Sequence, residues 1–230
     1  MTELLQDISL FPLLLTLATY QLGLWCQKKT RSPLCNPLLI ATALSIVVLL
    51  LTDFDLQLYQ TRSGWITWLL TPATVSLAVP LYGQLKAFKN QIGAILVGVA
   101  AGTVTSLFFI GVLCGVWQLD TTLTVSLLPK SITTAIGVVL SEQNGGIPAL
   151  TSAAIVITGI LGNLIGSFAC KILRISDPIA QGVGLGTASH VIGTSRATEI
   201  DPLAGAVSSL SLVVAGILTS VLFPLVLLLR

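Results

Sequence analysis

The sequence of 230 residues contains few charged groups. Only 9% of its residues are Asp, Glu, Lys or Arg, whereas 54% are hydrophobic, and the net charge is +2. A soluble domain of this length carries far more charge on its surface, so the composition excludes a water-soluble protein. So small a net charge also gives no reason to expect a nucleic-acid partner. We therefore expect an integral membrane protein.

Groups that carry enzyme chemistry are equally scarce. The sequence has one histidine and no catalytic triad or metal-ligand spacing. Its four cysteines show no C-x-x-C pattern and are predicted to act as small apolar residues; they are Cys26, Cys35, Cys114 and Cys170. The glycines at 182, 184 and 186 lack the preceding strand that a dinucleotide-binding loop requires. We expect no enzyme, no metal and no cofactor.

Several apolar runs reach the roughly 18 to 20 residues that cross a bilayer. They predict an all-α, polytopic bundle of membrane helices with six full spans, at 4–25, 33–52, 65–82, 92–117, 147–170 and 203–228. The first is interpreted as a retained span, because Glu3 and Asp7 stand where a signal peptide carries basic residues. Pro72 and Pro80 interrupt the third span.

The basic residues predict the orientation of the spans. Basic clusters at 28–31 and 86–89 alternate along the chain with acidic residues at 53–55 and Asp120. Because Lys and Arg are enriched in cytoplasmic loops, the two basic clusters are predicted to lie in the cytoplasm. The N-terminus and Asp120 are then outside.

The segment 121–146 does not fit a simple crossing. A further basic cluster at 171–174 should also be cytoplasmic, so the span before it must begin outside, on the side of Asp120. The segment therefore begins and ends on one face. With Pro129 and Lys130 near its middle, it is predicted to be a re-entrant hairpin of two half-length helices, buried in protein or lining a watery cavity.

A second copy of this pattern follows. The sequence from Ser126 aligns without gaps with the sequence from Val183 at an offset of 57 residues (199 − 142 and 216 − 159), which pairs Glu142 with Glu199. The second hairpin, at 177–201, would enter from the cytoplasmic face. Paired polar breaks within apolar sequence are typical of transporters built from inverted repeats.

We therefore predict one membrane domain of six full spans and two re-entrant hairpins. It comprises N-terminal spans at 1–118 and hairpin repeats at 119–172 and 173–230. In the alternative layout, each polar element is a broken helix that crosses the membrane, giving eight crossings. Gly-x-x-x-Gly pairs predict tight helix packing, within the chain or between copies in a homo-oligomer; they begin at Gly98, Gly111 and Gly162.

Lys130 is the first candidate for chemistry. An ionisable residue at membrane depth is costly and indicates function. Together with the hydroxyls of Ser131, Thr133 and Thr134 and the free N–H groups at a half-helix end, it could bind a carboxylate. In the alternative, Lys130 forms a structural ion pair, for example with Glu199.

Four further polar residues have alternative roles. His190 is either a proton relay and anion ligand or a neutral side chain bonded to a backbone carbonyl. Arg196 either holds a carboxylate through two hydrogen bonds or reaches from the interface to water. Glu142 and Glu199 either bind a proton or sodium ion or cap neighbouring helices.

Three stretches of the chain resemble the LrgB family of bacterial membrane proteins. They are Leu-Pro-Lys-Ser-Ile-Thr-Thr-Ala-Ile at 128–136, Gly-Gly-Ile-Pro-Ala-Leu at 145–150 and Gly-Thr-Ala-Ser-His-Val-Ile-Gly-Thr-Ser-Arg at 186–196; Asn-Pro-Leu-Leu at 36–39 agrees. The resemblance covers essentially the whole chain. It implies functional roles for Lys130, Ser131, Thr133, Ser189, His190 and Arg196. Ile132 replaces the Val of the family pattern, which is a conservative change.

The resemblance implies two functions. The family includes the carboxy-terminal half of the plastidial glycolate/glycerate translocator, so we expect a secondary transporter of small monocarboxylates (glycolate, glycerate, pyruvate or lactate-like), with His190 or Glu199 as candidates for proton coupling. The alternative is an antiholin-like regulator of murein hydrolase export and autolysis that acts with a small LrgA-like partner. A third reading is a subunit that is inactive without that partner. Each places the chain in the bacterial inner membrane.

Overall fold

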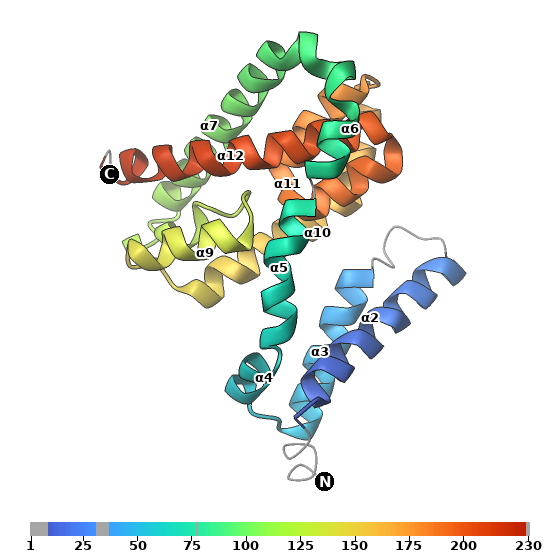
Figure 1. The fold of residues 1–230 in the computed structure, drawn as a ribbon. Helices are drawn as coiled ribbons and strands as arrows, with labels where there is room; N and C mark the ends of the chain where they lie inside the picture. The colour runs from blue at the N-terminus through green and yellow to red at the C-terminus, as the bar shows by residue number, and fades with distance from the viewer. Residues whose placement is uncertain (1–8, 31–36, 77, 229–230) are drawn as a thin grey trace. The chain divides into compact units, whose positions relative to one another are not determined.

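The computed structural model describes residues 9–30, 37–76 and 78–228, and every regular element within them is a helix (Figure 1). This confirms the all-α prediction. The predictions for Glu3, Asp7 and Cys35 lie outside the described residues. The chain divides into two compact units, Met1–Ser76 and Leu77–Arg230. The predicted boundaries at 118 and 172 stay predictions.

The first unit contains four helices. They are α2 (Phe11–Thr30), α3 (Pro37–Thr52), α4 (Leu56–Arg62) and α5 (Gly64–Ser76). Helices α2 and α3 form an antiparallel pair, in which Gly23 leaves room for the backbone of Pro37. The hydroxyls of Thr19 and Ser45 bond across the pair at 3.0 Å. Such polar contacts between small residues are typical of helices that pack in a membrane.

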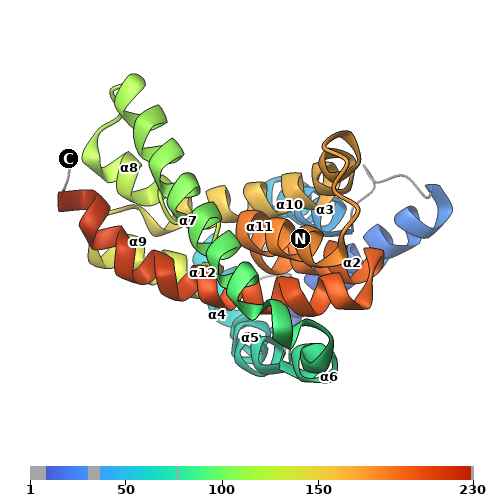
Figure 2. The ribbon, with the colours of Figure 1, turned by 90° about the horizontal axis from the view of Figure 1, so that it is seen from above.

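The second unit is built around its last helix. Its elements are α6 (Ala78–Phe88), the short 3₁₀ helix η1 (Lys89–Gln91), α7 (Ile92–Val116), α8 (Thr121–Leu127), α9 (Thr134–Gln143), α10 (Pro148–Ile172), α11 (Pro178–Ile200) and α12 (Pro202–Leu228). Helix α12 packs against α6, α7, α9 and α11, and its closeness to α11 is visible in Figure 2. Phe88, Ile95 and Val207 lie at the centre of the core that these helices share.

Three described helices are long and apolar enough to cross a membrane. They are Lys89–Val116 (η1 with α7), α10 and α12, and they confirm the predicted spans at 92–117, 147–170 and 203–228. Helix α3 is apolar but has only 16 residues. The predicted span at 65–82 falls on two helices, α5 and α6, and residue 77 between them is not described. The total of six spans stays a prediction.

The segment 121–146 consists of two short helices joined by an irregular stretch. Asp120 caps α8 by accepting a hydrogen bond from Leu123 N at 2.7 Å, and α9 begins after Thr133. Gly145, at φ 83°, makes the turn that leads to α10. Ser126 Oγ accepts a hydrogen bond from Ile147 N at 2.7 Å, which ties the end of α8 to the start of α10. We call this segment hairpin 1.

Helix α11 bends sharply where the second break was predicted. Ser189 (φ −136°, ψ 18°) and His190 (φ 43°, ψ −135°) leave helical geometry. The first arm, before the bend, packs its glycines against α12. Gly182 lies against Ala204, and Gly186 lies against Ser208. The contacts advance along both helices, so this arm runs parallel to α12.

The second arm, after the bend, runs the other way. Thr194 Oγ1 and Ser208 Oγ share a hydrogen bond of 2.8 Å, and Thr198 packs on Gly205. The contacts advance along the arm but go back along α12, so this arm is antiparallel to α12. The two arms are therefore antiparallel to each other. We call α11 hairpin 2, and its geometry is that of a folded-back hairpin.

The two hairpins repeat their internal geometry and exchange contacts. In each, a glycine approaches the carbonyl of the residue eight positions earlier: Gly137 approaches Pro129, and Gly193 approaches Leu185 (137 − 129 = 193 − 185 = 8).

The exchanged contacts involve two glycines that align at the offset of 57 residues. Gly159 on α10 receives Ile192 of hairpin 2, and Gly216 on α12 receives Ile136 of hairpin 1. Each long helix therefore packs against the hairpin of the other repeat.

The packing of hairpin 2 on α12 gives a test of stability. A Cβ on Gly186 would collide with the backbone of Ser208, whereas a Cβ on Gly184, in the same arm, has nothing within 4 Å. Gly186→Ala should lower the melting temperature of the detergent-purified protein by about 3 to 10 °C, corresponding to roughly 1–3 kcal/mol of overpacking. Gly184→Ala is the matched control and should leave it unchanged or raise it. Equal melting temperatures for the two variants would refute this packing.

Candidate functional site

Lys130 lies in the irregular stretch of hairpin 1 and is half-buried. Its Nζ donates a hydrogen bond to Ser131 Oγ at 3.2 Å. No carboxylate of the described residues forms an ion pair with Lys130, and the Glu199 carboxylate pairs with Arg196 instead. The alternative of a Lys130–Glu199 ion pair is therefore wrong. The positive charge of Lys130 lacks a counter-charge within the described chain.

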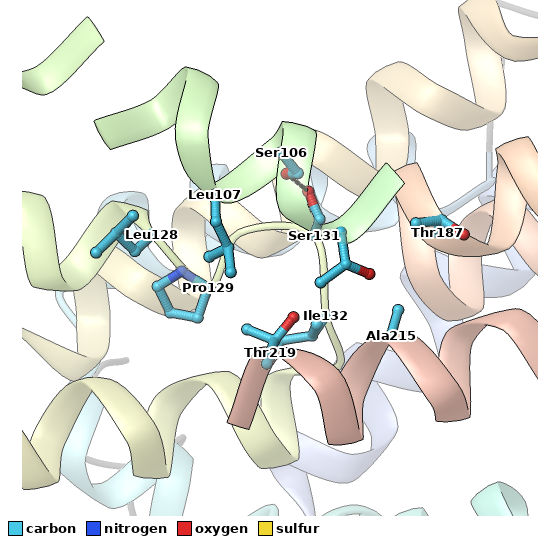
Figure 3. A pocket seen from close by; sticks show the side chains of 10 residues that line it. Ser106, Leu107, Leu128, Pro129, Ser131, Ile132, Thr187, Ala215 and Thr219 are labelled. Atoms are coloured by element: carbon cyan, nitrogen blue, oxygen red, sulfur yellow. Dashed lines mark hydrogen bonds between the residues drawn. The ribbon is translucent and has the colours of Figure 1, made fainter. Parts of the chain in front are cut away.

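Ser131 connects this lysine to helix α7. Ser131 is buried, and its Oγ lies 2.9 Å from Ser106 Oγ. The two side chains point toward one another in Figure 3. Ser106 belongs to α7, so the hydrogen bond joins the turn of hairpin 1 to the preceding long helix.

A small cavity lies beside this serine pair (Figure 3). About 10 Å³ of it is open to the centre of a water molecule, which is room for a single water. Its polar wall is formed by hydroxyl groups from three parts of the second unit, Thr103, Ser106, Ser131, Thr187 and Thr219. We call this space the hydroxyl cavity. Hairpin 1 and hairpin 2 meet there, because Ser131 and Thr187 share its wall.

Two of these hydroxyls lack hydrogen-bond partners. Thr103 is 3% exposed and Thr187 is 6% exposed, and their Oγ1 atoms are buried without a partner in the described chain. A buried hydroxyl left unsatisfied costs about 1–3 kcal/mol. The hydroxyl cavity is therefore suited to a bound group that can form hydrogen bonds.

A more open groove adjoins the cavity. Lys130 and Thr105 line the groove, and Ser106, Ser131 and Thr187 line both the groove and the cavity. Gly102 allows this arrangement, because a Cβ there would lie 2.8 Å from Thr187 Cγ2. The predicted Gly98-x-x-x-Gly102 pair thus brings α7 and hairpin 2 together. The charge of Lys130 and the hydroxyl cavity lie on opposite sides of Ser131.

His190 is at the bend of hairpin 2 and is 4% exposed. Its Nε2 lies 2.9 Å from Ile155 O, so Nε2–H donates to this carbonyl. This is the backbone contact given as one alternative above, and it leaves Nδ1 for a second partner. His190 packs on Gly159 and is close enough to Lys130 for an electrostatic interaction between them. Its left-handed backbone is uncommon for a non-glycine residue and is held by this packing.

Ser189 and Thr194 hold the bend in place. Ser189 is buried, and its side chain occupies the space beside Gly162 on α10. Thr194 Oγ1 is 2.9 Å from His190 O, to which it donates. The Gly162-x-x-x-Gly166 pair packs against hairpin 2 as well, since Leu185 lies against Gly166.

Arg196 lies away from the cavity, along the second arm of hairpin 2. Its Nε donates to Ser167 Oγ on α10 at 2.7 Å, and its Nη1 is 2.6 Å from Glu199 Oε2. Asn163 Nδ2 donates to Ile192 O at 3.2 Å in the same interface. These contacts join α10 to hairpin 2.

The remaining predicted residues do not line the cavity. Thr133 is the N-cap residue of α9 but its side chain makes no capping hydrogen bond, and Thr134 is exposed in the first turn. Glu142 is exposed near the end of the same helix. The structure therefore brings together Lys130, Ser131 and His190 from the predicted set.

Sequence reasoning missed the contribution of α7 and α12 to this site. Thr103 and Ser106 lie three residues apart on one face of α7, next to Gly102, and Thr219 lies on α12. Polar residues at this spacing within a long apolar run were a usable signal. Thr187 lies in the recognised motif at 186–196 but received no role.

Known proteins of bacteria are similar to this chain. It is 34% identical over 229 residues to a holin-like protein CidB of Staphylococcus epidermidis, covering 100% of this chain and 99% of that protein. It is 33% identical over 216 residues to an antiholin-like protein LrgB of Bacillus cereus, covering 94% of each chain. No solved structure matches the chain.

These relatives and the long apolar helices identify a multi-pass protein of the bacterial cell membrane. The model of the LrgB-like family matches residues 16–229, which is nearly the whole sequence. The chain belongs to the LrgB-like family.

Proposed function

We propose that this protein has a non-enzymatic, holin- or antiholin-like role in the cell membrane, in which it controls murein hydrolase export and autolysis. The names of its bacterial relatives support this role, since their alignments cover nearly the whole chain at about one-third identity. A small LrgA-like membrane protein is the proposed partner, and a homo-oligomer the proposed assembly.

This role predicts a cellular phenotype. Deletion of the gene in its bacterial host should change the rate of detergent-induced autolysis at least several-fold, and the wild-type gene should restore it. An antiholin-like protein restrains lysis, so its loss speeds autolysis, whereas loss of a holin-like protein slows it. The measurement is the fall in culture turbidity after detergent addition. Unchanged autolysis in the deletion strain would contradict the proposal.

The geometry favours a second candidate function, secondary transport of a small monocarboxylate. The observation that carries it is Lys130, which lacks an ion-pair partner in the described chain and lies beside hydroxyl groups where hairpin 1 meets hairpin 2. A charged side chain at membrane depth costs about 2.5–3.5 kcal/mol on insertion scales. An anion bound beside Lys130 would offset this cost, and a small carboxylate also suits the neighbouring hydroxyls.

The arrangement of the hairpins supports this candidate. In transporters built from inverted repeats, solute sites lie near mid-membrane where broken helices meet. The equal turn size of the two hairpins and their exchanged contacts at Gly159 and Gly216 support such a repeat here. We place hairpin 1 as entering from outside and hairpin 2 from the cytoplasm, on the grounds of the basic residues in the loops.

His190 is the proposed site of proton coupling. It is buried, lies near Lys130 and retains Nδ1 as a proton acceptor when Nε2–H is bonded to Ile155 O. Glu142 and Glu199 are less suitable, because both are exposed and Glu199 is paired with Arg196. Protonation of His190 beside Lys130 would add positive charge when an anion is bound.

The transport candidate predicts that Lys130→Ala abolishes flux. In proteoliposomes, counterflow of labelled glycolate or pyruvate should fall at least about tenfold, since a charge-assisted hydrogen bond contributes roughly 1.5–3 kcal/mol. Lys171→Ala, at the exposed end of α10, is the control and should retain flux. Equal membrane insertion and size-exclusion profiles would establish that both variants fold.

The result separates the candidate functions. Full flux through Lys130→Ala would refute the site. Flux from the purified chain alone would exclude a requirement for an LrgA-like partner. Absence of flux from the wild-type chain, together with an autolysis phenotype in cells, would leave the holin- or antiholin-like role alone.

A further inference from the structure

The hydroxyl cavity is too small for a whole carboxylic acid. Its 10 Å³ matches one water molecule or one hydroxyl-sized group. A bound acid therefore lies in the adjoining groove, which Lys130 lines, and only a substituent of the acid can enter the cavity.

The hydrogen bonds around the cavity define what enters it. Ser131 and Ser106 are already bonded to one another, and Ser131 also accepts from Lys130. Thr103 Oγ1 and Thr187 Oγ1 are buried and lack partners in the described chain. A threonine hydroxyl both donates and accepts, so the pair can bind either an alcohol or a keto oxygen.

The cavity and the charge are close neighbours. Ser131 Oγ lies 3.2 Å from Lys130 Nζ, and Ser131 lines the cavity on its other side. A carboxylate bound to Lys130 therefore places its adjacent carbon next to the cavity. An oxygen on that carbon is the substituent within reach of Thr103 and Thr187.

We propose that Thr103 and Thr187 are specificity-determining residues, which bind an oxygen on the carbon next to the carboxylate of the solute. This inference rests on the transport candidate above and assigns to it two residues outside the predicted set. An acid without that oxygen leaves both hydroxyls unsatisfied, and sites built to bond a hydroxyl strongly reject analogues that lack one.

The experiment compares glycolate with acetate, which has the same number of carbons and lacks the hydroxyl. The purified full-length protein is tested by thermal shift and by competition in counterflow. The wild type should require at least about tenfold less glycolate than acetate for half-saturation, since an unsatisfied buried hydroxyl costs about 1–3 kcal/mol. Thr103→Val and Thr187→Val should each weaken glycolate binding by about tenfold and leave acetate binding unchanged.

Thr105→Val is the matched control. Thr105 lines the groove on the same helix as Thr103 but not the cavity, so its replacement should keep the preference for glycolate. Melting temperatures without ligand establish that each variant folds. If either cavity variant fails to fold, the Ser substitution at that position, which retains the hydroxyl, replaces it and should keep the preference.

Each outcome has one meaning. If the wild type prefers glycolate and both cavity variants keep this preference, the assignment of Thr103 and Thr187 is wrong, and transport stands. If the wild type binds glycolate and acetate equally, the cavity holds only water and the inference is wrong. If it binds and transports neither, the transport candidate itself fails.

Discussion

Close contact between helix backbones is the constraint on which the second unit depends. Inside a membrane the hydrophobic effect does not drive helices together, so they associate through close packing and hydrogen bonds. Glycines meet this need at each face of hairpin 2: Gly182 and Gly186 toward α12, and Gly159 and Gly162 toward the bend. A larger side chain at these positions would separate the helices and open the hydroxyl cavity.

Hydroxyl groups then supply the directional contacts that close packing lacks. Thr151 Oγ1 donates to Ser141 Oγ at 2.7 Å in hairpin 1, and Thr194 bonds to Ser208 in hairpin 2. Thr151 and Ser208 are equivalent at the offset of 57 residues (208 − 151). The same kind of bond thus joins each hairpin to the helix that follows it. Against this regular pattern, the unpartnered Thr103 and Thr187 are exceptions that indicate binding.

The sequence predicted the features that follow from local chemistry. Long apolar runs predicted α7, α10 and α12, and the aspartates and prolines at 120, 177 and 201–202 mark helix starts in the structure. The polar breaks at Lys130 and His190 fall where the chain turns. The repeat was found because its two copies share residues at a constant offset.

Features that depend on distant contacts could not be predicted from the sequence. The Arg196–Glu199 pair and its bond to Ser167 need the position of α10, which no local pattern gives. Thr103 and Ser106 are unremarkable residues of a long apolar helix until hairpin 1 packs against them. Whether Lys130 had a counter-ion also depended on where Glu199 lay in three dimensions.

The exchanged contacts at Gly159 and Gly216 have a mechanical consequence. Because the long helix of each repeat supports the hairpin of the other, neither hairpin can leave its position without disturbing the helix that follows its counterpart. The two halves are interlocked, and a movement that releases one side of the site is transmitted to the other. Such reciprocal linkage would let a single rocking motion expose the lysine to one aqueous compartment while it is withdrawn from the opposite one.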